Sequence, residues 1–397
     1  MRLLHLLLHN FRNYVRLDLD LPPGVSVLLG DNAQGKTNLL EAIFYLATSR
    51  SSHAGADREL VNWLAVEQEP LPYARLVGRV RRSEGEPAVQ TGNEQTIEIT
   101  LSQEMNNGLR FRKQIRLNGV ARRAMDLLGQ LNVVMFLPED IGLVYGSPSL
   151  RRRYLDVTLC QIAPPYCQAL SHYNEVVAQR NALLRDLRER GGDPGQLLFW
   201  DERLIAHGAT LVARRWKAIE ALDELACQVH LELTDGAERL HARYLPSVEH
   251  DGPGDVQSVA LAFQAQLGAL RRREIAAGVT LAGPHRDEVR FLINGVDAGV
   301  YGSRGQQRTI SLALKLAEVD LMHRETGECP VLLLDDVLSE LDAQRRRFLV
   351  HRLDVGAADP RQAIITSTDL HAFPAEFLQR CHLWRVQLGR LQPLAAP

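Results

Sequence analysis

The sequence is short of several residue types, and each shortage argues against a class of protein. Its 397 residues include five cysteines without CxxC spacing, which argues against a zinc site or a disulfide framework and favours a reducing compartment. No apolar run reaches the about 18 residues that a membrane-spanning helix needs, so no membrane partner is expected. The formal net charge is only −2, so any nucleic-acid contact would depend on a local basic patch. These features predict a soluble, cytoplasmic globular protein.

Lysine is also scarce, and one lysine lies in a phosphate-binding motif. Lysine and arginine together number 46, yet Lys36 keeps a compact ammonium within the pattern GxxxxGK[ST] of residues 30–37. A buried-strand pattern over 25–29 precedes the motif, and a helical pattern over 37–46 follows it. In that arrangement the loop amides and the start of the helix point at phosphates. Lys36 would reach the β and γ oxygens, and Thr37 would ligate Mg²⁺. The alternative is a glycine turn that carries a surface lysine.

Two adjacent carboxylates close a second buried strand. The apolar run Val331–Leu334 is followed directly by Asp335 and Asp336. A buried parallel strand delivers such acids to the carboxyl edge of its sheet, where a phosphate loop also lies. Asp335 would there hold Mg²⁺, and Asp336 could orient the attacking water. The alternative is a strand followed by an acidic turn.

A third element, residues 301–308, combines small residues with the start of a helix. Ser303 and Gly305 can leave backbone amides free just before the helical pattern, which makes a second anion-binding helix N-terminus. One nucleotide has no need of two such cradles on one chain, whereas two chains face to face do. The alternative is an ordinary helix cap in which Ser303 is the capping residue.

The chain changes character twice, which predicts an α/β fold with an insertion. Residues 1–148 and 278–397 carry short strand patterns, whereas 149–277 show helical periodicity and no strand signal. We expect this insertion to form antiparallel helical hairpins. Its predicted helices cover 169–190, 196–234 and 255–277. The predicted strands cover 75–80, 95–101, 109–117, 132–137, 289–293, 331–334 and 364–368, with a polar loop at 82–94.

The order of these motifs resembles that of ABC-type ATPase heads, in which the SxGQ motif of one subunit closes on the γ-phosphate held by the other. The long helical insertion between the phosphate loop and SxGQ is similar to the SMC-like branch of these ATPases. The whole set resembles the RecF family. The segments that carry this resemblance are Phe11–Tyr14, Gly30–Thr37, Phe136–Asp140, Gly146–Pro148, Arg151–Asp156, Gly283–Asp287, Ser303–Arg308, Leu334–Asp336 and Ser339–Asp342.

The resemblance implies a slow, DNA-stimulated ATPase that uses ATP and Mg²⁺ and forms a homodimer on ATP. Such a protein would recognise double-stranded DNA near gaps and, with RecR and RecO, help to load RecA. The ATPase head would consist of residues 1–148 and 278–397, with 149–277 as an inserted arm. The residues implied in nucleotide binding or turnover are Gly30, Asp31, Asn32, Ala33, Gln34, Gly35, Lys36, Thr37, Asn38, Ser303, Gly305, Gln306, Asp335 and Asp336.

The chain departs from the ABC pattern at several positions. Typical ABC heads have Glu where this chain has Asp336, which is one methylene shorter, so turnover should be slow. Ala54 stands where the family stretch Ser-His-Arg has its arginine. No glutamine of the sequence is assigned to the Q-loop, and no histidine directly follows the strand at 364–368. Thr366 or Thr368 is the candidate for the switch position.

Five basic residues of the first segment are the candidates for DNA contact. Such side chains bind phosphate and carry no base code, so binding would be independent of sequence and sensitive to salt. The alternative is a solvated face or pairing with nearby acids. Aromatic residues make up only 6%, which weakens the case for a platform that stacks single strands. The five residues are Arg112, Lys113, Arg116, Arg122 and Arg123.

Three other kinds of protein share part of this pattern. An architectural SMC-like DNA clamp would use ATP only to close a ring, but no heptad run is sustained here. A transporter-type ABC ATPase subunit has the same motif order but lacks a long helical insertion. A phosphate-loop kinase is disfavoured by SxGQ and by the pair Asp335 and Asp336.

Overall fold

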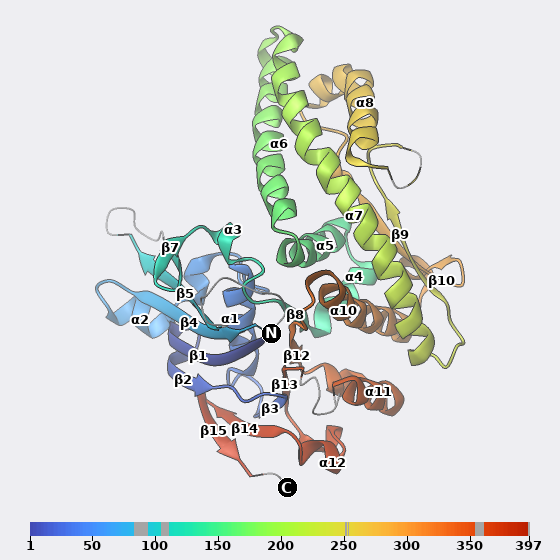
Figure 1. The fold of residues 1–397 in the computed structure, drawn as a ribbon. Helices are drawn as coiled ribbons and strands as arrows, with labels where there is room; N and C mark the ends of the chain where they lie inside the picture. The colour runs from blue at the N-terminus through green and yellow to red at the C-terminus, as the bar shows by residue number, and fades with distance from the viewer. Residues whose placement is uncertain (83–93, 105–110, 251, 253, 354–360, 396–397) are drawn as a thin grey trace. The chain divides into compact units, whose positions relative to one another are not determined.

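The computed structural model of the chain describes residues 1–82, 94–104, 111–250, 252, 254–353 and 361–395 (Figure 1). They form two compact units, one made of Met1–Asp140 with Glu318–Pro397 and the other of Ile141–Ala317. The predicted loop at 82–94 lies almost wholly outside the described residues. Within the described part of the chain, none of the helices has the length and apolar character needed to cross a membrane.

The first unit contains two six-stranded sheets with helix α1, Lys36–Thr48, in contact with strands of both. One sheet is antiparallel, with the order β2-β1-β4-β5-β6-β7. The other has the order β15-β14-β3-β13-β12-β8 and is parallel except for β15. The strands of the antiparallel sheet are β1 Arg2–Phe11, β2 Tyr14–Asp20, β4 Tyr73–Arg81, β5 Glu94–Gln103, β6 Phe111–Leu117 and β7 Val120–Arg122. Those of the other sheet are β3 Val25–Leu29, β8 Val133–Phe136, β12 Val331–Asp335, β13 Ala363–Ser367, β14 His382–Gln387 and β15 Arg390–Leu394.

The central strands of the second sheet are apolar on both faces. Every residue of β12 and β13 is buried, as expected for parallel strands that are covered on both sides. The remaining short elements of the first unit are η1 Asp57–Leu60, α2 Trp63–Gln68, α3 Ala124–Leu127, η2 Pro138–Ile141, η5 Val337–Glu340, α11 Ala343–Leu353, η6 Leu370–Ala372 and α12 Ala375–Leu378.

The second unit is mainly helical, and its long helices α6 and α7 run side by side (Figure 1). Helix α7 has 37 residues, which corresponds to about 55 Å. The helices are α4 Gly142–Tyr145, α5 Pro148–Ile162, α6 Pro164–Arg190, η3 Pro194–Gln196, α7 Leu197–Leu233, α8 Val256–Ala277, η4 Pro284–Arg286, α9 Ala298–Tyr301 and the first part of α10 Arg304–Thr326. A three-stranded sheet of order β11-β10-β9 packs with them; its strands are β9 Leu240–Leu245, β10 Glu288–Ile293 and β11 Val296–Asp297.

Two fully buried arginines tie the helices of this unit together. Arg180 on α6 donates to Asp201 on α7 at 2.8 Å and to Glu274 on α8 at 2.6 Å. Arg215 on α7 donates to Asp287 at 2.9 Å and to Asp156 on α5 at 2.8 Å. Each guanidinium meets two carboxylates, so the buried charges compensate one another. Because the partners lie on different elements, these ion pairs fix which helices are neighbours.

The structure confirms most of the predicted elements and corrects one point. The predicted strand at 25–29 and the three long helices are present. The segment 149–277 is not wholly helical, because it contains β9, which pairs with β10 across more than forty residues of sequence. Its six residues alternate between buried and more exposed positions, a pattern too short to stand out beside long helices. The second compact unit, residues 141–317, includes more of the chain than the predicted arm, residues 149–277. The predicted domain limits stay a prediction.

Candidate nucleotide-binding site

The glycine-rich loop lies between β3 and α1, as the strand–loop–helix pattern predicts. Gly35 has φ 111°, and a β-carbon there would come within 2.5 Å of Asn13 Nδ2, so the position requires glycine. Lys36 is buried, and its Nζ donates to the carbonyls of Gly30 at 2.6 Å and Asp31 at 2.8 Å. The ammonium therefore lies inside the curve of the loop, whereas the alternative of an ordinary turn expected a surface lysine.

Neighbouring segments hold the loop in place from two sides. Asn13 donates to the carbonyl of Gln34 at 3.0 Å, and the Tyr14 hydroxyl donates to the carbonyl of Gly35 at 2.9 Å. From the turn after β14, the amide of Gly389 also donates to Gln34 O at 3.0 Å. The segment containing Asn13 and Tyr14 thus has a physical role in shaping the loop. Asn38, predicted to bind the nucleotide, donates its side-chain amide to Asn13 Oδ1 at 2.8 Å.

The paired carboxylates lie at the carboxyl edge of the same sheet as the loop. Strand β13 lies between β3 and β12, and Thr366 on it pairs in register with Asp335. The Thr366 hydroxyl donates to Asp335 Oδ1 at 2.7 Å and accepts from the amide of Asp336 at 2.9 Å. Thr366, one of the two candidates for the switch position, is therefore hydrogen-bonded to Asp335. Thr368, the other candidate, is exposed just beyond the strand.

Charge interactions connect the loop lysine to these carboxylates. Burial lowers the pKa of Lys36, although the negative charges of Asp336, Asp335 and Asp31 oppose that shift. Burial raises the pKa of Asp336, and the negative charge of Asp335 adds to this. Asp336 has φ 50°, and among the described residues its buried Oδ1 has no hydrogen-bond partner. The site thus combines one partly desolvated cation with a carboxylate oxygen that is available to a ligand or a water.

The residues that would hold Mg²⁺ have suitable donor atoms. Thr37 supplies a hydroxyl, and Asp335 supplies a carboxylate at the end of β12; Mg²⁺ prefers such oxygen ligands. The unpartnered Oδ1 of Asp336 is a further acceptor in the same neighbourhood. No cluster of three or more His, Cys, Asp or Glu side chains suited to a metal occurs within the described ranges. A metal here would therefore be shared with the phosphates of a nucleotide, as is usual for Mg²⁺.

Helix α1 carries a buried carboxylate, Glu41, that was not predicted from the sequence. Both of its oxygens accept from Arg12, at 2.8 and 2.9 Å, and it also accepts from the Ser51 hydroxyl. Burial would raise the pKa of Glu41, but the hydrogen bonds from Arg12 and Ser51 outweigh it and the pKa is lowered. Ser51 Oγ accepts in turn from the amides of His53 and Ala54. An acidic residue on an otherwise apolar helix face could have indicated this, because a buried carboxylate needs a partner that compensates its charge.

The predicted signature segment begins helix α10 in the second unit. Ser303 Oγ accepts from the amide of Gln306 at 3.2 Å, while Gln306 Oε1 accepts from the amide of Ser303 at 2.9 Å. This reciprocal pair is a capping box, so the capping alternative describes the arrangement seen here. Ser303, Arg304 and Gly305 are nevertheless exposed. The role of Ser303, Gly305 and Gln306 in nucleotide binding stays a prediction.

The five basic residues predicted to contact DNA divide into two groups. Lys113 is engaged within the protein, where it donates to Ser49 O at 2.8 Å and pairs with Asp57 at 3.1 Å. Arg122 lies opposite Ile115, and Arg123 follows β7. Arg112 and Arg116 alternate with Lys113 along β6 and so project from the opposite face of the sheet. The four arginines of the set are exposed.

Three arginines on β4, at positions 75, 79 and 81, share the face of Arg112 and Arg116 and were missed. The registers of β4 with β5 and of β5 with β6 place Arg75 and Arg79 on that face of the sheet. They also contact acids, with Arg75 2.8 Å from Glu98 and Arg79 3.6 Å from Asp20. Residues separated by an even number of positions along a strand point to the same side of the sheet, so the spacing of these arginines could have indicated their shared face. Together these residues make an arginine-rich sheet face partly balanced by carboxylates.

A phosphate loop and a carboxylate pair at one edge of a parallel sheet, with a capped SxGQ helix start, define an ABC-type ATPase head. Comparison with known proteins gives the family. The model of the "RecF/RecN/SMC N terminal domain" matches residues 2–377. The DNA replication and repair protein RecF of Chloroflexus aurantiacus is 45% identical over 98% of this chain and 98% of that protein. RecF of Bacillus subtilis is 37% identical over 97% of this chain and 98% of its own length. The chain belongs to the RecF family.

Solved structures agree with this assignment. One described as "Structure of the recombination mediator protein RecF-ATP in RecFOR pathway" has a TM-score of 0.86 and 32% identity, covering 99% of this chain and 97% of its own. An Smc head domain from Pyrococcus furiosus has a TM-score of 0.53 and 15% identity, covering 99% of this chain and 95% of its own. The second likeness concerns the fold alone.

Proposed function

We propose that the chain is an ATP-dependent DNA-binding protein of recombinational repair. Two copies bind ATP between the phosphate loop of one and the SxGQ helix start of the other, and they hydrolyse it slowly with stimulation by DNA. In this role the protein acts on gapped DNA with RecO and RecR and promotes the loading of RecA. The names of its relatives support a role in replication and repair. The similar structure of RecF with ATP supports ATP as the nucleotide and the RecFOR pathway as the setting.

The observation that carries the proposal is the position of Lys36. Its ammonium lies inside the loop and interacts electrostatically with Asp335 and Asp336 from the neighbouring strand end. When Mg²⁺ is bound, it would offset the negative charge of the phosphates. Thr37 and Asp335 would hold it, and Asp336 would orient water. Slow turnover fits an aspartate at 336, because its carboxylate reaches less far than that of glutamate.

DNA contact is proposed for the arginine-rich sheet face. Arg75 and Arg79 are partly neutralised by nearby carboxylates, whereas no acid among the described residues forms an ion pair with the exposed Arg112 and Arg116. Guanidinium groups of this kind bind backbone phosphates irrespective of sequence. Lys113 is assigned instead to the fold of the unit, because its ammonium is already bonded to Ser49 and Asp57. A transporter-type subunit is not supported, because the family assignment points to RecF.

The mass of the purified protein with and without ATP tests the proposal. With Mg·ATP and duplex DNA we expect the wild-type mass to double, as measured by light scattering after size exclusion. Lys36→Ala should lose ATP binding and remain a monomer. Ser303→Arg should bind ATP and yet remain a monomer. A wild-type protein that stays monomeric under saturating Mg·ATP and DNA would refute the proposal.

A second substitution at Ser303 separates dimer contact from helix capping. Ser303→Arg also removes the cap of α10, which typically costs about 1 kcal/mol. Ser303→Asp keeps a good capping oxygen but places a negative charge where the partner's triphosphate would lie. We expect both variants to bind ATP and neither to dimerise. If Ser303→Asp dimerises as well as wild type, the SxGQ segment does not face the nucleotide of a partner.

A further inference from the structure

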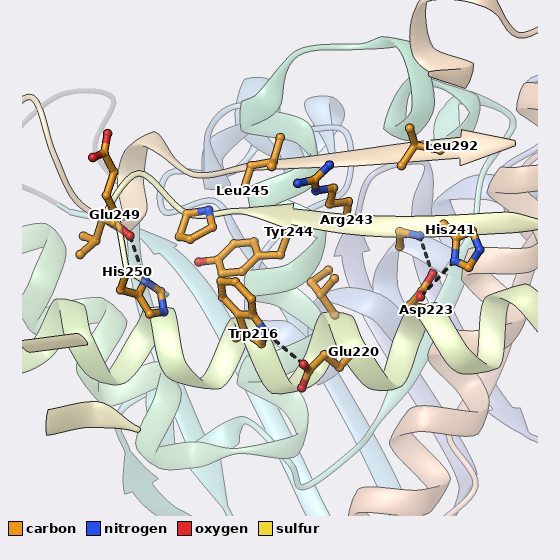
Figure 2. Close-up of a pocket in the computed structure, with 14 residues that line it drawn as sticks. Trp216, Glu220, Asp223, His241, Arg243, Tyr244, Leu245, Glu249, His250 and Leu292 are labelled. Atoms are coloured by element: carbon orange, nitrogen blue, oxygen red, sulfur yellow. Dashed lines mark hydrogen bonds and ion pairs between the residues drawn. The ribbon is translucent and has the colours of Figure 1, made fainter. Parts of the chain in front are cut away.

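A groove lies in the second unit, and none of its lining residues is among those proposed above to bind nucleotide. It has a volume of about 830 Å³ and runs between helix α7 and strand β9 (Figure 2). Side chains from both elements project into it, and the segment after β9 closes one end. The residues that define it best are Trp216, Glu220, Asp223, Arg243, Glu249 and His250.

Strand β9 is the edge of its sheet, and the groove follows its free side. In the part of the chain that the structure describes, the order β11-β10-β9 leaves one side of β9 without a strand. The amide of Ala242 donates to Asp223 Oδ1 at 2.6 Å, so it points away from β10 and toward α7. The carbonyl of Arg239 accepts from the backbone amide of Asn294, just beyond the end of β10. The odd-numbered residues of β9 therefore form the hydrogen-bonded pairs with β10.

The alternation of an antiparallel ladder therefore exposes the other backbone groups of β9 to the groove. Ala242 and Tyr244 occupy positions whose N–H and C=O groups face away from β10. Asp223 satisfies the amide of Ala242. Among the residues that the structure describes, neither the amide of Tyr244 nor the carbonyl of Ala242 has a hydrogen-bond partner. A strand edge with unpaired backbone groups such as these is a template for another extended strand.

Three rings, one of them on α7, lie together in the lining of the groove. The ring of Trp216 lies edge-on to Tyr244, with centroids 5.5 Å apart, and to His250 at 5.2 Å. The Trp216 indole N–H donates to Glu220 Oε1 at 3.0 Å, so its ring is held in place on α7 (Figure 2). An oriented indole beside a carboxylate suits a cationic side chain, which gains from both the π face and the charge.

The charged side chains of the groove also favour a basic occupant. Glu220, Asp223 and Glu249 carry negative charge, whereas Arg243 is the one arginine in the lining. Glu220 and Glu249 are exposed and can turn toward a ligand. Nucleic acid would meet repulsion from three carboxylates at close range. A protein segment with a lysine or arginine meets attraction instead.

We propose that this groove binds an extended segment of a partner protein, which adds as a strand to the free edge of β9. Its backbone pairs with the carbonyl of Ala242 and the amide of Tyr244, and a lysine or arginine of the segment lies between Trp216 and the carboxylates of Glu220 and Glu249. Addition of a strand to a sheet edge gives affinity through main-chain hydrogen bonds and specificity through side-chain pockets. A strand of six residues such as β9 accommodates a segment of about 20 Å.

Peptide selection on the full-length protein, without nucleotide, tests the occupant. A phage-displayed library of random nonapeptides is panned on wild type and counter-selected on the double variant Glu220→Lys, Glu249→Lys. We expect enriched peptides to share a lysine or arginine at one position and to lose at least tenfold in affinity with the double variant. Trp216→Ala should weaken the same peptides. Glu202→Lys reverses an exposed charge elsewhere on α7 and should leave the affinity unchanged. Enrichment that does not depend on Glu220, Glu249 and Trp216 overturns the proposal.

Two further measurements test strand addition itself. In the best peptide, N-methylation of the backbone should abolish binding at every second position and have little effect at those between. Binding should also slow hydrogen exchange of the Tyr244 amide. A methylation pattern with helical spacing, or an unchanged Tyr244 amide, overturns the proposal even if peptides bind. Circular dichroism of each variant checks that it is folded.

The oligomeric state without nucleotide separates this inference from the ATP-dependent dimer. The wild-type chain should be monomeric in the absence of ATP, and the peptide affinity should be the same for Lys36→Ala. If the chain instead self-associates without nucleotide and the double charge reversal dissolves that complex, the groove takes a second copy and the proposal fails. Failure of the ATP-dependent dimer leaves the peptide result unaffected.

Discussion

The hydroxyl of Thr366 donates to Oδ1 of Asp335 across 2.7 Å, at the point where β12 and β13 end side by side. The same hydroxyl oxygen accepts from the backbone amide of Asp336 at 2.9 Å. One side chain thus orients the carboxylate proposed to hold Mg²⁺ and fixes the backbone of the next residue. Because Thr366 is buried, water does not replace these bonds when the hydroxyl is removed.

We therefore predict that Thr366→Val lowers ATP turnover while ATP binding persists. Valine keeps the shape of threonine but leaves Asp335 without this donor. Loss of a residue that orients a metal ligand typically costs about 10- to 100-fold in activity or metal affinity. The expected result is a lower kcat and a higher Mg²⁺ concentration for half-maximal rate. Thr366→Ser, which keeps the hydroxyl, should restore most of both; equal defects in the two variants would show that packing alone is responsible.

Asp336→Asn is predicted to arrest the protein in its ATP-bound dimer. The amide keeps the size of the side chain but removes the charge that would orient water, and Asp336 Oδ1 has no other partner among the described residues. Hydrolysis should fall by about 10²–10⁴-fold, the range usual for loss of a general base. Light scattering should detect a dimer that persists for longer after ATP addition than that of wild type. Unchanged turnover would exclude a catalytic role for Asp336.

The DNA contact is predicted to depend on Arg112 and Arg116. The double variant to alanine should weaken binding of duplexes of any sequence and reduce the slope of log K against log salt by about 2, one unit for each phosphate that is no longer neutralised. Fluorescence anisotropy over a series of salt concentrations measures this slope. Arg385→Ala removes an exposed arginine from the other sheet of the unit and serves as control. An unchanged slope for the double variant would place the DNA elsewhere.

How far the sequence predicted this site depends on whether the relevant contacts are local. The phosphate loop was predictable, because Gly30, Gly35 and Lys36 act within one turn of chain between a strand and a helix. The two acids at the end of β12 were predictable for the same reason. The bond between Thr366 and Asp335 was not, because it joins positions thirty-one residues apart through the register of two parallel strands. A short apolar pattern in the sequence predicts a strand but does not indicate which other strand will lie beside it.

Long-range pairing also accounts for what was missed elsewhere. Strand β9 exists because β10 and α7 cover it, and its own six residues are too few to outweigh the helical pattern around them. The arginines on β4 were visible in the sequence, but their common face with Arg116 required the register through β5. The internal role of Lys113 depended on Ser49 and Asp57, which come from a distant segment.

Arg180→Leu is predicted to destabilise the second unit strongly. The substitution leaves Asp201 and Glu274 buried without the guanidinium that bridges them, and such a broken pair typically costs about 3–5 kcal/mol. Arg188→Leu removes an exposed arginine from the same helix and should cost less than about 1 kcal/mol. Hydrogen exchange of α6 to α8 in urea measures both. Adding Asp201→Asn and Glu274→Gln to Arg180→Leu should recover part of the loss; no recovery would indicate that packing of the long side chain matters more than charge.

The buried histidine His285 predicts an acid limit for the second unit. Its Nδ1 is 2.7 Å from the Tyr173 hydroxyl and its Nε2 is 3.2 Å from the carbonyl of Thr280, an arrangement that suits a neutral ring donating from Nε2. Burial lowers the pKa of His285 from 6.5 to about 4, and the positive charges of Arg286, Arg152 and Arg180 add to this although the Thr280 carbonyl opposes it. Below pH 6.5 the unfolded chain takes up a proton that the folded one does not, so stability falls as the pH decreases toward 4.

The measurement compares wild type with His285→Gln between about pH 7 and about pH 4.5, which spans most of the interval between the two pKa values. Glutamine keeps a donor and an acceptor but does not titrate in this range, so the free energy of unfolding of the variant should depend less steeply on pH. Its disadvantage relative to wild type should therefore shrink as the pH falls. His371→Gln removes an exposed histidine from the other unit and controls for the substitution itself. If wild type and His285→Gln lose stability in parallel on acidification, His285 is not the group that titrates.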